Sequence, residues 1–203
     1  MIAIFDRQHF GKPGRSDVGA AYDVDQDGHV EWQEQEIHLT PLYYEPAIEA
    51  LTAAGHRCHL LDQGWYRDRH QLAIQISKRY PGQPTAYIAC HVNAGRGDYA
   101  AGIHDWRSRG GARLAEAIAA SLGDAGLPGV ERSLVRSASR TNGWRRGLST
   151  IEGIIVGPAW LSGLCFEPYF LDNPDHAGCA TPEGGALIGQ ALARGLIRWG
   201  EGV

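Results

Sequence analysis

Nearly continuous apolar runs recur along this chain, and each leads into a histidine or a glutamate. The longest of them occupy residues 2–6, 86–90 and 161–166. Runs of this length without polar alternation are typical of strands that are buried on both faces of a parallel-rich sheet. Segments with apolar residues at helical spacing separate them, so the pattern predicts an α/β fold.

The remaining elements follow from the same pattern. Further strands are predicted at residues 57–61, 103–106 and 151–156. Helices are predicted at residues 41–54, 68–80, 111–122 and 185–199. Residues 132–146 combine arginines with Gly, Ser, Thr and Asn, which predicts a basic loop. This loop either meets carboxylates of a polyanionic substrate or is simply solvated.

Length and composition indicate one globular domain over residues 1–203. The chain has 203 residues, of which 43% are hydrophobic, enough to bury a full core. It has no apolar run of transmembrane length, no secretory signal pattern and no Cys-x-x-Cys pair. We therefore expect a monomer that is made in the cytoplasm without a signal peptide, with no stable membrane association and no disulfides. The basic segment lacks interleaved aromatic residues, so we expect no nucleic-acid binding.

The residues that follow the apolar runs point to metal chemistry. They are His9, His91 and Glu167. Because the carboxyl ends of parallel strands meet at one edge of a sheet, these side chains are expected to converge. Two imidazoles and a carboxylate can hold Zn²⁺ with a position open for water, while a further carboxylate moves protons. Glu34 and Glu36, just before the first helix, both offer the carboxylate ligand, and the set predicts a metallohydrolase.

An acidic segment at residues 23–34 has the spacing of an EF-hand calcium loop. Aspartates stand at its first, third and fifth positions, glycine at the sixth, an aliphatic residue at the eighth and glutamate at the twelfth. The predicted Ca²⁺ ligands are Asp23, Asp25, Asp27, the carbonyl group of His29, and Glu34. If calcium occupies this loop, Glu36 is left for zinc. The alternative is a solvated acidic turn.

Motifs in matching order extend over almost the whole chain. Residues 6–11 read Asp-Arg-Gln-His-Phe-Gly, residues 17–20 read Asp-Val-Gly-Ala, residues 89–94 read Ala-Cys-His-Val-Asn-Ala, and residues 167–174 read Glu-Pro-Tyr-Phe-Leu-Asp-Asn-Pro. Together they resemble the motifs of zinc-dependent N-acetylmuramoyl-L-alanine amidases of the type 3 catalytic domain. Gln8 and Phe10 stand where this family has glycines, so the backbone path of the first loop is not carried over.

The resemblance implies a mixed, mostly parallel sheet of about six strands with helices on both faces. The site residues that it implies are the zinc ligands His9, Glu36 and His91, the catalytic residue Glu167, and Asn93, which supports the site by hydrogen bonding. Glu36 is preferred to Glu34 because its distance to Gly55, where the helix ends, matches the family without an insertion.

The expected activity is hydrolysis of the peptidoglycan amide between N-acetylmuramic acid and L-alanine. Zinc would polarise this amide, and Glu167 would pass a proton from water to the leaving amine. Without a wall-binding module or signal peptide, the chain resembles a compact phage endolysin that reaches the cell wall through a separate lysis pore. Two alternatives remain open: a zinc amidase or peptidase for another amide, and a non-catalytic, calcium-dependent wall-binding pseudoenzyme.

Overall fold

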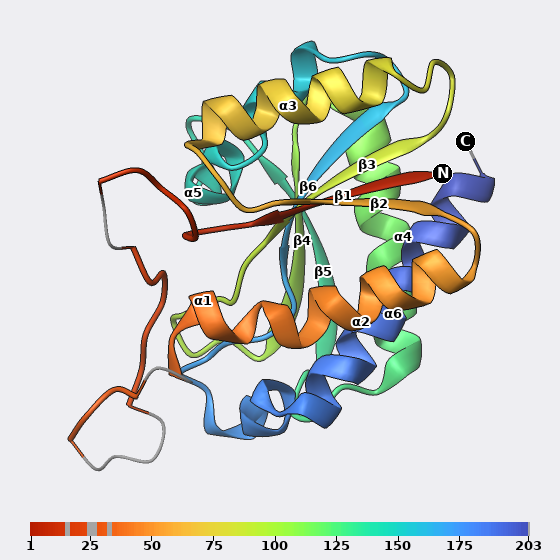
Figure 1. The fold of residues 1–203 in the computed structure, drawn as a ribbon. Coiled ribbons are helices and arrows are strands. Elements are labelled where there is room, and N and C mark those ends of the chain that lie inside the picture. The colour runs from red at the N-terminus through yellow and green to blue at the C-terminus, as the bar shows by residue number, and fades with distance from the viewer. Residues whose placement is uncertain (15–16, 24–27, 32–33, 203) are drawn as a thin grey trace.

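A six-stranded sheet runs through the computed structural model, which describes residues 1–14, 17–23, 28–31 and 34–202 (Figure 1). The strands are β1 (Ile2–Arg7), β2 (Arg57–Leu61), β3 (Thr85–Cys90), β4 (Tyr99–Asp105), β5 (Arg132–Ala138) and β6 (Leu161–Glu167). Their order is β2-β1-β3-β6-β4-β5. All neighbours are parallel except β4 and β6, which are antiparallel. The predicted mixed, mostly parallel sheet is therefore confirmed.

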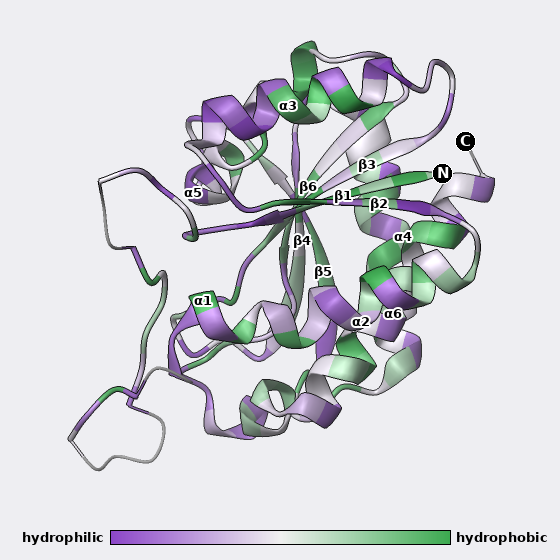
Figure 2. Ribbon diagram, viewed as in Figure 1, coloured by the Kyte–Doolittle hydropathy of each residue, from purple (hydrophilic) through white to green (hydrophobic). Residues whose placement is uncertain are grey.

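Helices cover both faces of this sheet, as predicted (Figure 1). The helices are α1 (Glu36–Leu39), α2 (Pro41–Ala53), α3 (Tyr66–Lys78), α4 (Arg109–Ala125), α5 (Arg145–Ser149) and α6 (Pro182–Glu201), with 3-10 helices η2 (Glu152–Val156) and η3 (Pro174–Ala180). One hydrophobic cluster joins the sheet to α2, α4 and α6, and a second joins the other face to α3 and η2. Figure 2 shows hydrophilic and hydrophobic residues alternating along α3, as expected for a helix with one face on the sheet.

The central strands bring their carboxyl ends to the same edge. β1, β3 and β6 are adjacent, and in their parallel register Arg7 lies opposite Cys90, which lies opposite Phe166. Their apolar side chains are almost completely buried on both faces, which explains the continuous apolar runs in the sequence. Residues that directly follow these strands therefore emerge side by side.

Two predicted elements are wrong. Residues 132–138, expected to belong to a basic loop, form β5, which pairs only with β4. An edge strand is partly solvated, so it tolerates polar residues that a central strand excludes. Residues 151–156, expected as a strand, include the 3-10 helix η2. Both sides of the neighbouring strand β6 are already paired, by β3 and β4, so no position beside it is left for another strand.

Within the described ranges, no helix combines the length and the apolar character that crossing a lipid bilayer requires.

Candidate metal centre and active site

The loop that carries His9 is fixed by a buried arginine. His9 has a backbone φ of 64°, in the left-handed region that is unfavourable for residues with a Cβ atom. Arg69 of α3 donates a hydrogen bond of 2.6 Å to the carbonyl oxygen of Arg7, and further ones to the Phe10 carbonyl and the Asp6 carboxylate. Arg69 is only 1% exposed. Its guanidinium group therefore acts as an internal brace for this loop.

The side chains that replace the family's glycines fit into the same loop. Gln8 is buried and donates to the Asp6 carboxylate. The Phe10 ring lies 3.9 Å from the guanidinium carbon of Arg7. Gly11 has a φ of 67°, and a Cβ atom there would collide with a neighbouring backbone carbonyl. The loop thus keeps a glycine at position 11, where a side chain is excluded, and accommodates the side chains at positions 8 and 10.

Asp17 orients the His9 ring. Its Oδ1 atom lies 2.8 Å from His9 Nδ1, and its Oδ2 atom accepts a hydrogen bond of 2.6 Å from Lys12 Nζ. Burial alone would raise the pKa of Asp17, but the hydrogen bonds from Lys12 and His9 outweigh it and lower that pKa to about 2. An ionised carboxylate at Nδ1 leaves His9 Nε2 as the atom that is available to a metal ion.

Glu36, the first residue of α1, lies between the two histidines. Its Oε1 atom lies 2.7 Å from His91 Nδ1 and accepts a hydrogen bond of 3.0 Å from the Val92 amide. Its Oε2 atom accepts one of 2.7 Å from the Ala20 amide and lies 3.4 Å from His9 Nε2. Both carboxylate oxygens are thus held by the backbone and directed at imidazoles.

The surroundings of Glu36 favour its charged form. Burial alone would raise its pKa, but the imidazoles of His91 and His9 outweigh burial and lower it. The nearby backbone is correspondingly tight: a Cβ atom on Gly19 would lie 2.4 Å from Glu36 Oε2. A side chain at position 19 would therefore displace this carboxylate.

The donor atoms of His9, Glu36 and His91 fit a zinc ion. One ligand atom from each residue lies within 4.8 Å of the others. The Nε2 atom of His91 is buried and has no hydrogen-bond partner within the described part of the chain, and the buried Nε2 atom of His9 has only the long 3.4 Å contact to Glu36. Buried imidazole nitrogens normally find a partner, and a His₂Glu set is a ligand set of catalytic zinc sites. The predicted choice of Glu36 over Glu34 agrees with this geometry.

Glu167 ends β6 and lies beside the candidate metal ligands. Its Oε2 atom accepts a hydrogen bond of 2.6 Å from Asn93 Nδ2, so Asn93 contacts this carboxylate rather than the metal position. Burial raises the pKa of Glu167, and the Glu36 charge adds to the rise, while His91 opposes it. The two carboxylates therefore have opposite pKa shifts, as is common where neighbouring acids have different roles.

All five residues that the sequence assigned to the zinc site line one cavity of about 520 Å³, which we call the catalytic cavity.

The predicted calcium loop is only partly described by the structure. Asp25 and Asp27 lie outside the described residues. Of the remaining predicted ligands, Asp23 accepts a hydrogen bond from the Gly28 amide, and Glu34 accepts one from the Glu31 amide. Calcium binding stays a prediction.

Sequence reasoning gave Asp17 and Lys12 no role in supporting the candidate metal centre, and it left Arg69 undecided between a structural and a substrate-facing role. Asp17 stands in the Asp-x-Gly-Ala motif, which was a usable signal. Lys12 and Arg69 carry no comparable signal, because Lys12 belongs to a loop and Arg69 acts on a segment about 60 positions away in the chain.

Solved amidase structures share this fold. The CwlD amidase from Clostridioides difficile, in complex with the GerS lipoprotein, superposes with a TM-score of 0.70 at 15% identity, over 98% of this chain and 97% of that chain. The amidase Ami1 from Mycobacterium smegmatis gives 0.67 at 17%, over 100% and 98%. The catalytic domain of the CD27L endolysin targeting Clostridia difficile gives 0.61 at 14%, over 97% and 96%.

The sequence matches no protein-family model and no curated protein. The likeness therefore lies in the fold, and it extends over nearly the full length of both chains. The protein has the fold of N-acetylmuramoyl-L-alanine amidase catalytic domains, as its motifs predicted.

Proposed function

We propose that this protein is a zinc-dependent N-acetylmuramoyl-L-alanine amidase that cleaves the peptidoglycan amide between the lactyl group of muramic acid and L-alanine. One observation carries the proposal: ligand atoms of His9, Glu36 and His91 converge within 4.8 Å, beside Glu167, in an amidase fold. Bound zinc supplies a Lewis acid that polarises an amide carbonyl and activates water at neutral pH.

The protein's own residues hold the ligands and move the proton. Asp17 and the Ala20 and Val92 amides keep His9 and Glu36 in place. Glu167 takes a proton from the attacking water and returns it to the nitrogen of the leaving L-alanine. Its raised pKa brings protonation closer to neutral pH, which suits a group that must both accept and release a proton.

Zinc analysis combined with digestion of purified sacculi tests the proposal. An amidase releases new amino groups of L-alanine and creates no new reducing sugar ends. Release of reducing ends, or of amino groups from another residue, would instead support a hydrolase for a different bond. Binding to sacculi without any release would support the wall-binding pseudoenzyme.

A Glu167→Gln variant separates turnover from binding. We expect it to retain zinc and sacculus binding while kcat falls by roughly 10²- to 10⁴-fold, the usual contribution of a general acid–base group. A variant that loses wall binding but keeps the wild-type kcat would refute the role of Glu167.

For the biological context we propose lysis by a phage-type endolysin, which the shared fold with an endolysin catalytic domain supports. The test is expression inside bacteria with and without a co-expressed membrane pore. Lysis only in the presence of the pore is the expected result. Growth that is unaffected in both cases would contradict a lytic role without affecting the proposed chemistry.

A further inference from the structure

A second cavity opens beside the catalytic cavity. It has a volume of about 450 Å³ and is lined by the rings of Tyr99, Trp144 and Phe170, so we call it the aromatic cavity. The residues that line both cavities are Asn93, Ala94, Arg146, Gly147 and Glu167. The metal ligands line only the catalytic cavity. The aromatic cavity therefore adjoins the proton carrier and not the metal position.

The aromatic walls are braced against one another. The Tyr99 and Phe170 rings have centroids 4.8 Å apart, and those of Tyr99 and Trp144 are 6.4 Å apart. The guanidinium group of Arg136 lies 5.5 Å from the Trp144 ring centroid, and that of Arg132 lies 6.0 Å from the Tyr99 centroid. These cation–π contacts place positive charge around an apolar surface.

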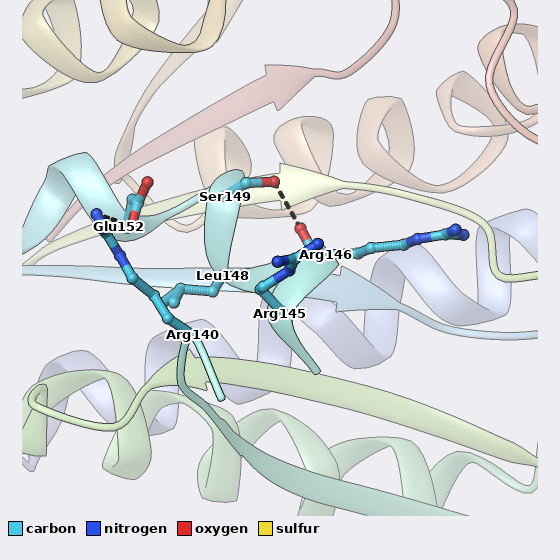
Figure 3. Close-up of a pocket in the computed structure, with 6 residues that line it drawn as sticks. All are labelled: Arg140, Arg145, Arg146, Leu148, Ser149 and Glu152. Carbon is cyan, nitrogen blue, oxygen red and sulfur yellow. Dashed lines mark hydrogen bonds and ion pairs between the residues drawn. The ribbon is translucent and has the colours of Figure 1, made fainter. Parts of the chain in front are cut away.

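Arg146 adds a cation that has no carboxylate partner among the described residues. Nearby arginines differ: Arg140 pairs with Glu152 at 3.2 Å, and Figure 3 shows this pair apart from Arg145 and Arg146. Arg146 is exposed where the two cavities meet. An unpaired guanidinium group is well suited to bind a carboxylate through two parallel hydrogen bonds.

The position of Arg146 depends on a close helix–strand contact. Arg146 and Gly147 belong to α5, which packs on β4. A Cβ atom on Gly147 would lie 2.9 Å from Ile103 of β4. The glycine therefore lets the helix approach the sheet and holds Arg146 at the rim of the catalytic cavity.

The position of the general acid decides which part of the substrate enters the aromatic cavity. A general acid must lie next to the leaving amine, and the leaving amine belongs to the peptide. The peptide therefore extends from Glu167 away from the metal ligands, into the aromatic cavity. We propose that this cavity holds the stem peptide and that Arg146 binds the carboxylate of the residue that follows L-alanine. This inference rests on the proposed function, because it takes Glu167 as the proton donor.

Two synthetic substrates test the inference directly. Both are N-acetylmuramoyl dipeptides of L-alanine followed by a D-glutamate residue, which carries either its two free carboxylates or carboxamides in place of both. For the zinc-loaded protein we expect kcat/KM to be roughly 10- to 100-fold higher for the carboxylate, the range of a hydrogen bond to a charged group. Arg146→Gln should abolish this preference, and Arg146→Lys should retain part of it.

Arg145→Gln is the matched control. Arg145 is also exposed and also lacks a carboxylate partner among the described residues, but it lines neither the catalytic nor the aromatic cavity. This variant should keep the full preference. Equal losses on both substrates in Arg146→Gln, or an equal loss of preference in Arg145→Gln, would overturn the assignment.

Binding of the free dipeptides, measured by calorimetry, gives a readout that does not need turnover. The carboxylate form should bind wild type more tightly than the carboxamide, and Arg146→Gln should bind both alike. If neither substrate is cleaved, the proposed function fails while the binding comparison still decides the role of Arg146. Equal binding of both dipeptides to wild type would refute it.

Discussion

Glu36 and Arg146 line the same cavity, but Glu36 is engaged at both carboxylate oxygens while no described residue pairs with the Arg146 guanidinium. The candidate metal centre is largely buried and supported by residues that lie far apart in the chain. The arginine-rich rim, formed by residues 140–149, is largely exposed. Prearranged partners keep the charges of the candidate metal centre in a fixed geometry, which the proposed electrostatic catalysis requires. A charge without a partner is free to bind an incoming substrate.

The largest expected effect is at the metal centre itself. Glu36→Gln removes the negative charge between His9 and His91, so zinc content and hydrolysis of sacculi should both fall to background. Glu34→Gln is the matched control, two residues earlier in the chain, and should retain both. Zinc retained in Glu36→Gln and lost in Glu34→Gln would reverse the ligand assignment and break the contrast between centre and rim.

Removing the brace behind His9 should cost the most stability. Arg69 and Asp6 form an ion pair whose side chains are 0% exposed, so Arg69→Met leaves a buried carboxylate without its cation. We expect a loss of about 3–5 kcal/mol in the free energy of unfolding, measured by urea titration. Arg140→Met, which breaks an exposed pair at the rim, should cost less than about 1 kcal/mol. Similar costs for both variants would show that the two regions are not built differently.

A smaller effect is expected one contact away from the metal. Asp17→Asn keeps the shape of the side chain but removes the charge that orients His9 through Nδ1. Zinc affinity, measured by competition with a chelator, should fall by roughly 10- to 100-fold. Asp124→Asn, on the exposed surface of α4, should leave the affinity unchanged. An unchanged affinity in Asp17→Asn would mean that His9 needs no orienting partner.

The sequence predicted the convergence of the candidate metal-centre residues better than it predicted the rim, for a physical reason. His9 and His91 follow strands that are buried on both faces, and Glu167 is the last residue of another such strand; strands of this kind leave a continuous apolar run in the sequence. Once those strands are parallel neighbours, the three side chains must lie near one another. Glu36 lies on a helix, so its assignment needed the spacing of a known family as well.

The rim and the supporting contacts leave weaker patterns. β5 is a solvated edge strand and α5 spans only 5 residues, so neither produces the periodicity from which elements are predicted. The Arg69 brace and the Arg146 site depend on which distant segments the fold brings together. Hydropathy along the chain indicates burial, but it does not identify the partner of a buried or exposed charge.

The smallest expected effect concerns stability and pH in the metal-free protein. Burial raises the pKa of Glu167 above its usual 4.5, so folding favours the protonated carboxyl group. That contribution to stability is fully present below the unfolded pKa and is lost as the pH rises through the folded pKa. Relative to wild type, Glu167→Gln should therefore gain stability as the pH rises from about 4 toward neutral, because glutamine has no charge to bury. Glu116→Gln, on the exposed side of α4, should follow wild type throughout. If the melting temperatures of Glu167→Gln and wild type stay parallel over this range, the charge of Glu167 imposes no cost on folding. The candidate metal centre and the rim would then differ in geometry alone.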